Sequence, residues 1–63
     1  MCQTSVFMEK DGEEELLLEN VTTLEVLENS LKITALFEGS KEFAGATIRH
    51  IDFAGGKVYL QQK

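Results

Sequence analysis

The sequence lacks most of the residues from which small proteins build internal cross-links or catalytic sites. Its 63 residues include no proline, no tryptophan, one histidine and one cysteine. A single cysteine excludes an internal disulfide, and no set of four cysteines and histidines is present for a structural zinc site. A chain of this length buries only about 60% of its unfolded surface, so a second subunit would help to stabilise it. We therefore expect one domain, residues 1–63, that is not an enzyme.

Positive charge is also scarce, since 11 acidic residues face 6 basic ones and the net charge is −5. This balance argues against a protein that binds nucleic acid by neutralising phosphates and against one that binds anionic membranes. No apolar run is long enough to span a bilayer, and no basic start with an apolar run marks a secretory signal. A lone thiol without an export signal favours a reducing compartment, so we expect a cytoplasmic protein with no membrane partner.

Alternation of apolar and polar residues predicts short β-strands joined by tight turns. In residues 3–9, Val6 and Met8 fall on one face of a strand. Asp11-Gly12 is a strong hairpin signal, because both residues tolerate positive φ. Residues 13–18 contain helix formers, but the preceding turn and the β-branched residues that follow favour a strand.

The rest of the chain continues the strand pattern. Residues 31–37 alternate, so Leu31, Ile33, Ala35 and Phe37 are expected to point inward. Leu36 breaks the polar face and is a candidate interface residue. Further strands are expected at residues 21–28, 46–53 and 58–60.

About six or seven short antiparallel strands, with turns every eight to twelve residues or so, are typical of an all-β sandwich or barrel. Two full sheets are too much for so short a chain. We therefore predict a small SH3-like β-barrel. Its corners are expected at the glycines, namely Gly12, Gly39, Gly45, Gly55 and Gly56.

Cys2 is the leading candidate for a metal ligand, because it lies next to the amino terminus. If Met1 is retained, the Met1 amine, the Cys2 backbone nitrogen and the Cys2 thiolate close two fused five-membered chelate rings. Square-planar nickel(II) and copper(II) can displace an amide proton and favour such sites. One chain supplies at most three donors, so two chains could share one ion across a two-fold axis. If Met1 is removed, Cys2 still offers an amine and a thiolate. The simpler alternative is a cysteine that packs as a small apolar residue.

The other chemically active residues form weaker patterns. His50 and Asp52 share a strand face and could form a weak ligand pair, but a surface pair is the simpler interpretation. The glutamates at 13–15 do not have the spacing of a calcium loop and are better interpreted as a solvated hairpin edge. The aromatic residues could form a stacking platform for single strands, although core positions suit them better: Phe7, Phe37, Phe43, Phe53 and Tyr59.

Several short motifs follow one another along almost the whole chain. They are Met1-Cys2, Asp11-Gly12, Asn20-Val21, the apolar strand that ends in Leu36-Phe37, Phe43-Ala44-Gly45, Ile51-Asp52-Phe53 and a Gly-Gly hairpin before Val58-Tyr59-Leu60. In this order they resemble the CooT-type nickel-binding proteins, which are linked to maturation of nickel-containing carbon monoxide dehydrogenase. One departure is Glu38-Gly39, where the resemblance leads us to expect Gly-Glu, and it affects the turn.

The resemblance implies a dimeric SH3-like barrel that binds one nickel(II) ion, Ni(2+), per homodimer. The ligands would be Cys2 and the backbone nitrogens of Met1 and Cys2. Such a protein would act as a metallochaperone, with carbon monoxide dehydrogenase or its maturation factors as partners. A planar site would select against tetrahedral zinc, and its affinity would fall as the pH is lowered, because the ligands must lose protons.

Two other functions remain open from the residues. A metal-free interaction module would present an exposed apolar surface around Leu27 and Leu36. A small RNA-binding barrel would show steeply salt-dependent binding, which the acidic composition does not favour.

Overall fold

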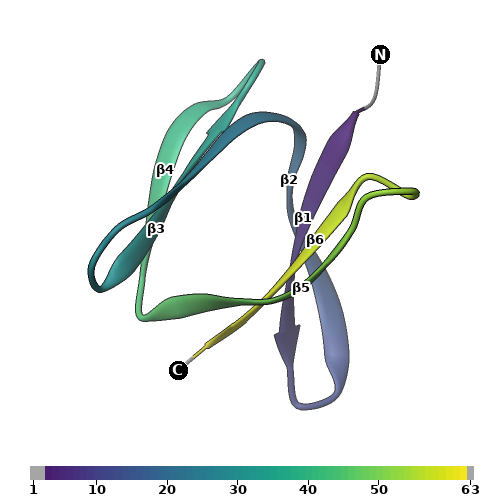
Figure 1. Cartoon of the computed structure of the whole chain (residues 1–63), viewed down its shortest axis with the longest axis vertical. Coiled ribbons are helices and arrows are strands. Elements are labelled where there is room, and N and C mark those ends of the chain that lie inside the picture. Colours follow the sequence, from purple (N-terminus) through teal and green to yellow (C-terminus); the bar gives the residue numbers. More distant parts are fainter. Residues whose placement is uncertain (1–2, 63) are drawn as a thin grey trace.

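The computed structural model describes residues 3–62 and consists of strands and turns (Figure 1). The strands are β1 (Thr4–Lys10), β2 (Glu13–Val26), β3 (Ser30–Ala35), β4 (Gly39–Ala44), β5 (Ala46–Asp52) and β6 (Lys57–Gln62). The prediction of an all-β protein is confirmed. Over residues 3–62 there is no helix long and apolar enough to cross a membrane.

The six strands form one sheet in the order β4-β3-β2-β1-β6-β5. All neighbouring pairs are antiparallel except β1 and β6, which are parallel. The expectation of antiparallel pairing throughout is therefore wrong at this one pair. No connection links β1 directly to β6, so no hairpin imposes an antiparallel direction on them.

The β1–β2 hairpin follows from the residues at its tip. Asp11 has φ of 54° and Gly12 has φ of 80°, which are the two positive values that a type I′ turn requires. The turn places Glu13 opposite Lys10 and starts β2 at once. The preference for a strand over a helix in residues 13–18 is confirmed, because pairing with β1 overrides their helix propensity.

A bend at Asn20 allows the 14-residue β2 to pair with two different strands. Asn20 has φ of 56°, a conformation that asparagine tolerates better than most residues. Before the bend β2 pairs with β1, Val21 just after the bend pairs with both β1 and β3, and the rest of the strand pairs with β3. The sheet therefore curls, and Figure 1 shows β3 and β4 facing β1 and β6 across the core.

The core fills the space inside this curl. Among the described residues the buried side chains are all apolar, and those that are fully buried include Val6, Leu18, Ile33 and Leu60. Val6 and Met8 lie on the same buried face, as predicted. The other members of the core cluster are Leu31, Ala35, Ala46 and Val58.

The two edge strands meet at one corner without closing the sheet. Only Gly45 separates β4 from β5, and its φ of 76° makes the bend that its position predicted. Its amide donates to the Asn29 carbonyl at 2.9 Å, and the Gln62 amide group donates to the Ala44 carbonyl at 3.1 Å. Within residues 3–62 no ladder joins β4 to β5. The predicted SH3-like barrel is thus corrected to a curled sheet with two open edges.

Two phenylalanines expected on inward or strand positions lie on the surface instead. Phe37 is 80% exposed and Phe53 is 84% exposed. β3 ends at Ala35 and β5 ends at Asp52, so both rings lie in turns rather than in strands. The alternation that predicts an inward Phe37 therefore stops two residues before it.

Complete burial of Ile33 in the core predicts a large effect of its truncation on stability. Replacing the fully buried Ile33 by Ala should lower the free energy of unfolding by about 2–5 kcal/mol, through lost burial and a residual cavity. A 63-residue domain has roughly 3–9 kcal/mol in total, so this change should leave much of the protein unfolded at 37 °C. Urea denaturation followed by circular dichroism measures the effect. Val26→Ala, at a side chain that is 67% exposed, is the control and should change stability by less than about 1 kcal/mol. Equal effects of the two changes would contradict the assigned core.

Candidate metal centre at the start of the first strand

The start of β1 is held on both sides. On one side the Ser5 amide donates to the Gly56 carbonyl at 2.8 Å, in the turn before β6. On the other side Thr4 pairs with Val21 of β2. The predicted ligands Met1 and Cys2 lie outside the described residues, but Gln3, the next residue, directly precedes this anchored strand.

Gly56 makes room for the backbone that leads to the amino terminus. Its φ is +67°, and a Cβ atom placed there would lie 2.7 Å from the Gln3 carbonyl oxygen. A backbone oxygen cannot move away as the end of a flexible side chain can. Glycine is therefore favoured at position 56 for two reasons: the backbone is left-handed there, and the Gln3 carbonyl approaches too closely to leave room for a Cβ atom.

Exposed apolar side chains border the start of β1 on both sides. Leu36 and Phe37, in the β3–β4 turn, are 65% and 80% exposed. The Leu36 amide donates to the Asn20 carbonyl at 2.9 Å, which ties this turn to β2 next to the position opposite Thr4. Phe53 lies in the β5–β6 turn, which also contains Gly56. Figure 1 shows the β3–β4 turn and the start of β1 at the same end of the molecule.

An apolar pocket of about 480 Å³ adjoins the same strand start. Thr4 contributes to its wall, and the remaining wall comes mainly from the second half of β2 and from β5 and its following turn. The apolar lining residues are Leu24, Val26, Ile48, Ile51, Phe53 and Val58, while Asp52 and Lys57 are its charged residues. The pocket and the exposed Phe53 at its wall together give the protein an apolar surface beside Thr4.

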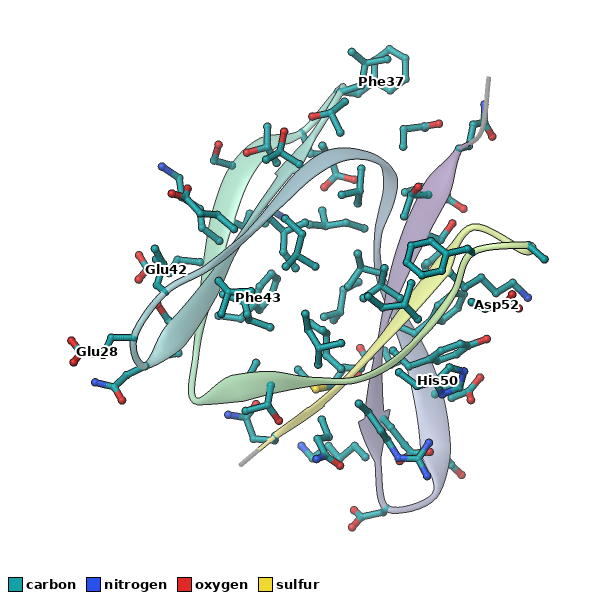
Figure 2. The ribbon with its side chains drawn as sticks, in the orientation of Figure 1. Glu28, Phe37, Glu42, Phe43, His50 and Asp52 are labelled. Carbon is teal, nitrogen blue, oxygen red and sulfur yellow. The ribbon has the colours of Figure 1, made fainter. Side chains whose placement is uncertain are left out.

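His50 and Asp52 are engaged in local interactions. The His50 ring lies on the Tyr59 ring with a centroid distance of 4.5 Å. One carboxylate oxygen of Asp52 accepts a hydrogen bond from the Gly55 amide at 3.0 Å. Figure 2 shows both side chains on β5. Asp52 lies nearer than His50 to the end of the molecule that carries Phe37. Asp52 thus stabilises the β5–β6 turn, and within residues 3–62 no interaction joins the two side chains into a ligand pair.

Acidic side chains are concentrated at the other end of β1. Glu13 and Glu14 pair in register with Lys10 and Glu9 in the β1–β2 hairpin. Glu9 also forms an ion pair with Arg49 at 2.9 Å. In the part of the chain that the structure describes, no group of three histidine, cysteine or acidic side chains could hold a metal ion. A soft thiolate ligand can come only from Cys2, the one cysteine in the sequence.

The chain is similar to known proteins in both sequence and fold. The family model for the CO dehydrogenase accessory protein CooT matches residues 1–61. An uncharacterised protein of Methanothermobacter thermautotrophicus is 33% identical over 61 residues, which cover 97% of this chain and 89% of that protein. A crystal structure of a candidate CooT from Carboxydothermus hydrogenoformans superposes with a TM-score of 0.85 at 27% identity, covering 98% of each chain.

The family whose model matches is a class of accessory proteins for CO dehydrogenase. The chain belongs to the CooT family. The resemblance inferred from the order of its motifs is therefore confirmed, and a role as an accessory protein fits the expectation that it is not an enzyme.

Phe37 and Phe53 are predicted to lie in strands and to suit the core, and both predictions are wrong, because the rings are exposed in turns. An alternating pattern does not show where a strand ends. One signal was available, since Leu36 already interrupts the alternation next to Phe37. The glycine that follows Glu38 has φ of 79°, which marks the turn.

Gly56 provides a test of how the strand start is held. Gly56→Ala should destabilise the protein by more than Gly12→Ala. Gly12 has a similar positive φ of +80°, but nothing lies within 4 Å of an added Cβ there. The control change should lower the free energy of unfolding by about 1–2 kcal/mol from backbone strain alone, and the Gln3 contact should add to this at Gly56. Thermal denaturation of both variants compares them, and equal losses would contradict the close approach of Gln3.

Proposed function

We propose that this protein is a nickel(II) metallochaperone that acts in the cytoplasm. In this proposal a homodimer holds one ion at its paired amino termini and delivers it to carbon monoxide dehydrogenase. Nickel is the cargo, so the protein binds and releases it without catalysing a reaction. Membership of the family of CO dehydrogenase accessory proteins supports the choice of acceptor.

The single observation that carries the proposal is the position of the start of β1. The Ser5–Gly56 hydrogen bond and the Thr4–Val21 pairing anchor a strand that starts one residue after the two candidate ligand residues. A donor set next to an anchored strand needs less ordering on binding than one on a long free tail. The amine, amide nitrogen and thiolate suit a planar nickel site.

A shared site follows from the number of donors. Three donors from one chain leave a four-coordinate ion incomplete, whereas two chains provide two thiolates and two or more nitrogens. A two-fold axis through the ion would make the two halves of the site identical. Ligands near a chain end also leave room for an acceptor protein to remove the ion by ligand exchange.

Nickel titration of the untagged protein tests the proposal. Native mass spectrometry should give one nickel per two chains, and absorption spectroscopy should show thiolate charge-transfer bands that saturate at the same ratio. Cys2→Ser should abolish the bands and lower the affinity at least 100-fold. Binding should also weaken as the pH is lowered, because the thiol and the backbone nitrogen must lose protons.

His50→Ala is the matched control, because it removes the one histidine in the chain from an exposed position on β5. This variant should bind nickel as the wild type does. If Cys2→Ser retains binding, or if His50→Ala loses it, the ion is not held at the amino terminus and the proposal fails.

An interaction module without metal is the second candidate function. The exposed Leu36 that this alternative requires is 65% exposed, whereas Leu27 is half-buried. A wild-type protein that binds no nickel would favour this alternative.

A further inference from the structure

We propose that β5 binds an extended segment of another protein, which adds to the sheet as a further strand in the groove between β5 and the end of β2. The segment carries apolar side chains at alternate positions and a lysine or arginine at the end next to Glu28. This surface is separate from the proposed nickel ligands, so its binding can be tested on the metal-free protein.

Two adjoining pockets form the groove. The first has a volume of about 340 Å³ and lies between the β2–β3 turn and the start of β5, which Figure 1 shows at the same corner of the molecule. The second is the pocket of about 480 Å³ described above. Val26 and Ile48 line both pockets, so the two are continuous. Both volumes lie in the usual range for pockets that bind ligands.

The groove follows the open edge of β5. Three consecutive residues, Ala46, Thr47 and Ile48, line the first pocket, and Ile51 and Asp52 line the second. Successive side chains of a strand point to opposite faces, so a hollow that touches consecutive residues reaches the strand edge. Within residues 3–62, β5 pairs with β6 alone. Its other edge therefore presents backbone N–H and C=O groups that another strand can bind.

The opposite wall of the groove leaves apolar core surface uncovered. Val26 pairs with the buried Leu31, so it lies on the core face of the sheet, yet it is 67% exposed. Ile51, on the β5 side, is 40% exposed. In the described part of the chain, the pairing of β2 with β1 ends at Val21, which is opposite Thr4. The curled sheet is thus open between β5 and the end of β2, and covering this apolar surface is favourable.

An extended segment matches both the edge and the groove. Its main chain can bond to the edge of β5, while side chains on one of its faces, about 7 Å apart, enter successive parts of the groove. Added strands of this kind gain affinity from main-chain hydrogen bonds and specificity from pockets for alternate side chains. The other edge strand, β4, is less suited, because its exposed Lys41 and Glu42 are the kind of charged residues that protect an edge.

The charges along the groove differ between its two ends. Asp52 and Lys57 are opposite each other in register at one end, so their charges offset. Glu28 lies at the other end, and neither of the ion pairs within residues 3–62 includes it. Glu42 accepts a hydrogen bond at 2.8 Å from Ser30, which lines the same pocket, and Figure 2 shows Glu28 and Glu42 on the same side of the molecule. This acidic end is complementary to a basic side chain, so it selects a segment that carries one.

Peptide binding to the metal-free protein, followed by nuclear magnetic resonance of its amide groups, tests the proposal. The probe is a short blocked peptide that alternates valine and threonine and has a lysine at each end. Its amide shift changes should be concentrated on residues 46–48 and 26–30. The same peptide with methylated backbone nitrogens should bind at least tenfold more weakly, because it cannot donate hydrogen bonds to β5. A peptide with a glutamate at each end should also bind at least tenfold more weakly.

Variants of the protein locate the contacts. Val26→Lys should weaken binding of the lysine peptide at least tenfold, because it places a charge in the groove. Leu16→Lys is its control, since Leu16 is 45% exposed and lies opposite Phe7 on the first half of β2. Glu28→Lys should reverse the preference, so that the glutamate peptide binds better. Glu14→Lys makes the same change in net charge at the β1–β2 hairpin and should leave the preference as it is. Circular dichroism should show that all four variants fold, since each changed side chain is exposed.

Several results would overturn the proposed surface. They are no binding at millimolar peptide, shift changes confined to other parts of the sheet, equal binding of the methylated peptide, and an unchanged preference in Glu28→Lys. A dilution series of the protein alone tests for a different occupant. If the amide signals of the groove residues change on dilution, a second copy of the chain fills the groove and the peptide proposal is wrong. Nickel binding at the amino terminus does not depend on any of these results, so the two proposals can fail separately.

Discussion

The parallel pairing of β1 with β6 is the contact on which the arrangement of the candidate site depends. It joins the first and last strands over five residue pairs, from Ser5–Lys57 to Glu9–Gln61. This pairing sets the start of β1 beside the turn that contains Phe53 and Gly56. Without it, β5 and β6 would have no strand partner in the rest of the sheet, and neither the pocket wall nor the close approach of Gln3 to Gly56 would exist.

The small size of the chain explains why its apolar residues are divided between a core and an exposed end. The bend at Asn20 lets a single long strand pair with two neighbours, and the curled sheet then encloses a small group of fully buried side chains. Such a core gives limited stability to 63 residues. Phe37 and Phe53 contribute nothing to this core, because both side chains are exposed in turns outside it.

Much of the fold could be predicted from local chemistry. The Asp11-Gly12 turn, the corner at Gly45 and the buried face of Val6 and Met8 all follow from backbone preferences and period-two alternation. The open edges and the parallel pair could not be predicted, because they depend on contacts between distant strands. Cys2 is a candidate ligand from its place in the chain alone. The exposure of Phe37 and Phe53 could be found only from the folded structure, because it depends on strands that end at Ala35 and Asp52.

The central claim is that one nickel ion is bound by the amino termini of two chains. X-ray absorption at the nickel edge of the loaded wild-type protein tests it most directly, because it counts the sulfur atoms around the ion. The account predicts two sulfur ligands per nickel, one from each Cys2, with nitrogen ligands completing a planar site. A shell of nitrogen and oxygen alone, or one sulfur per nickel, would contradict a site shared between two copies.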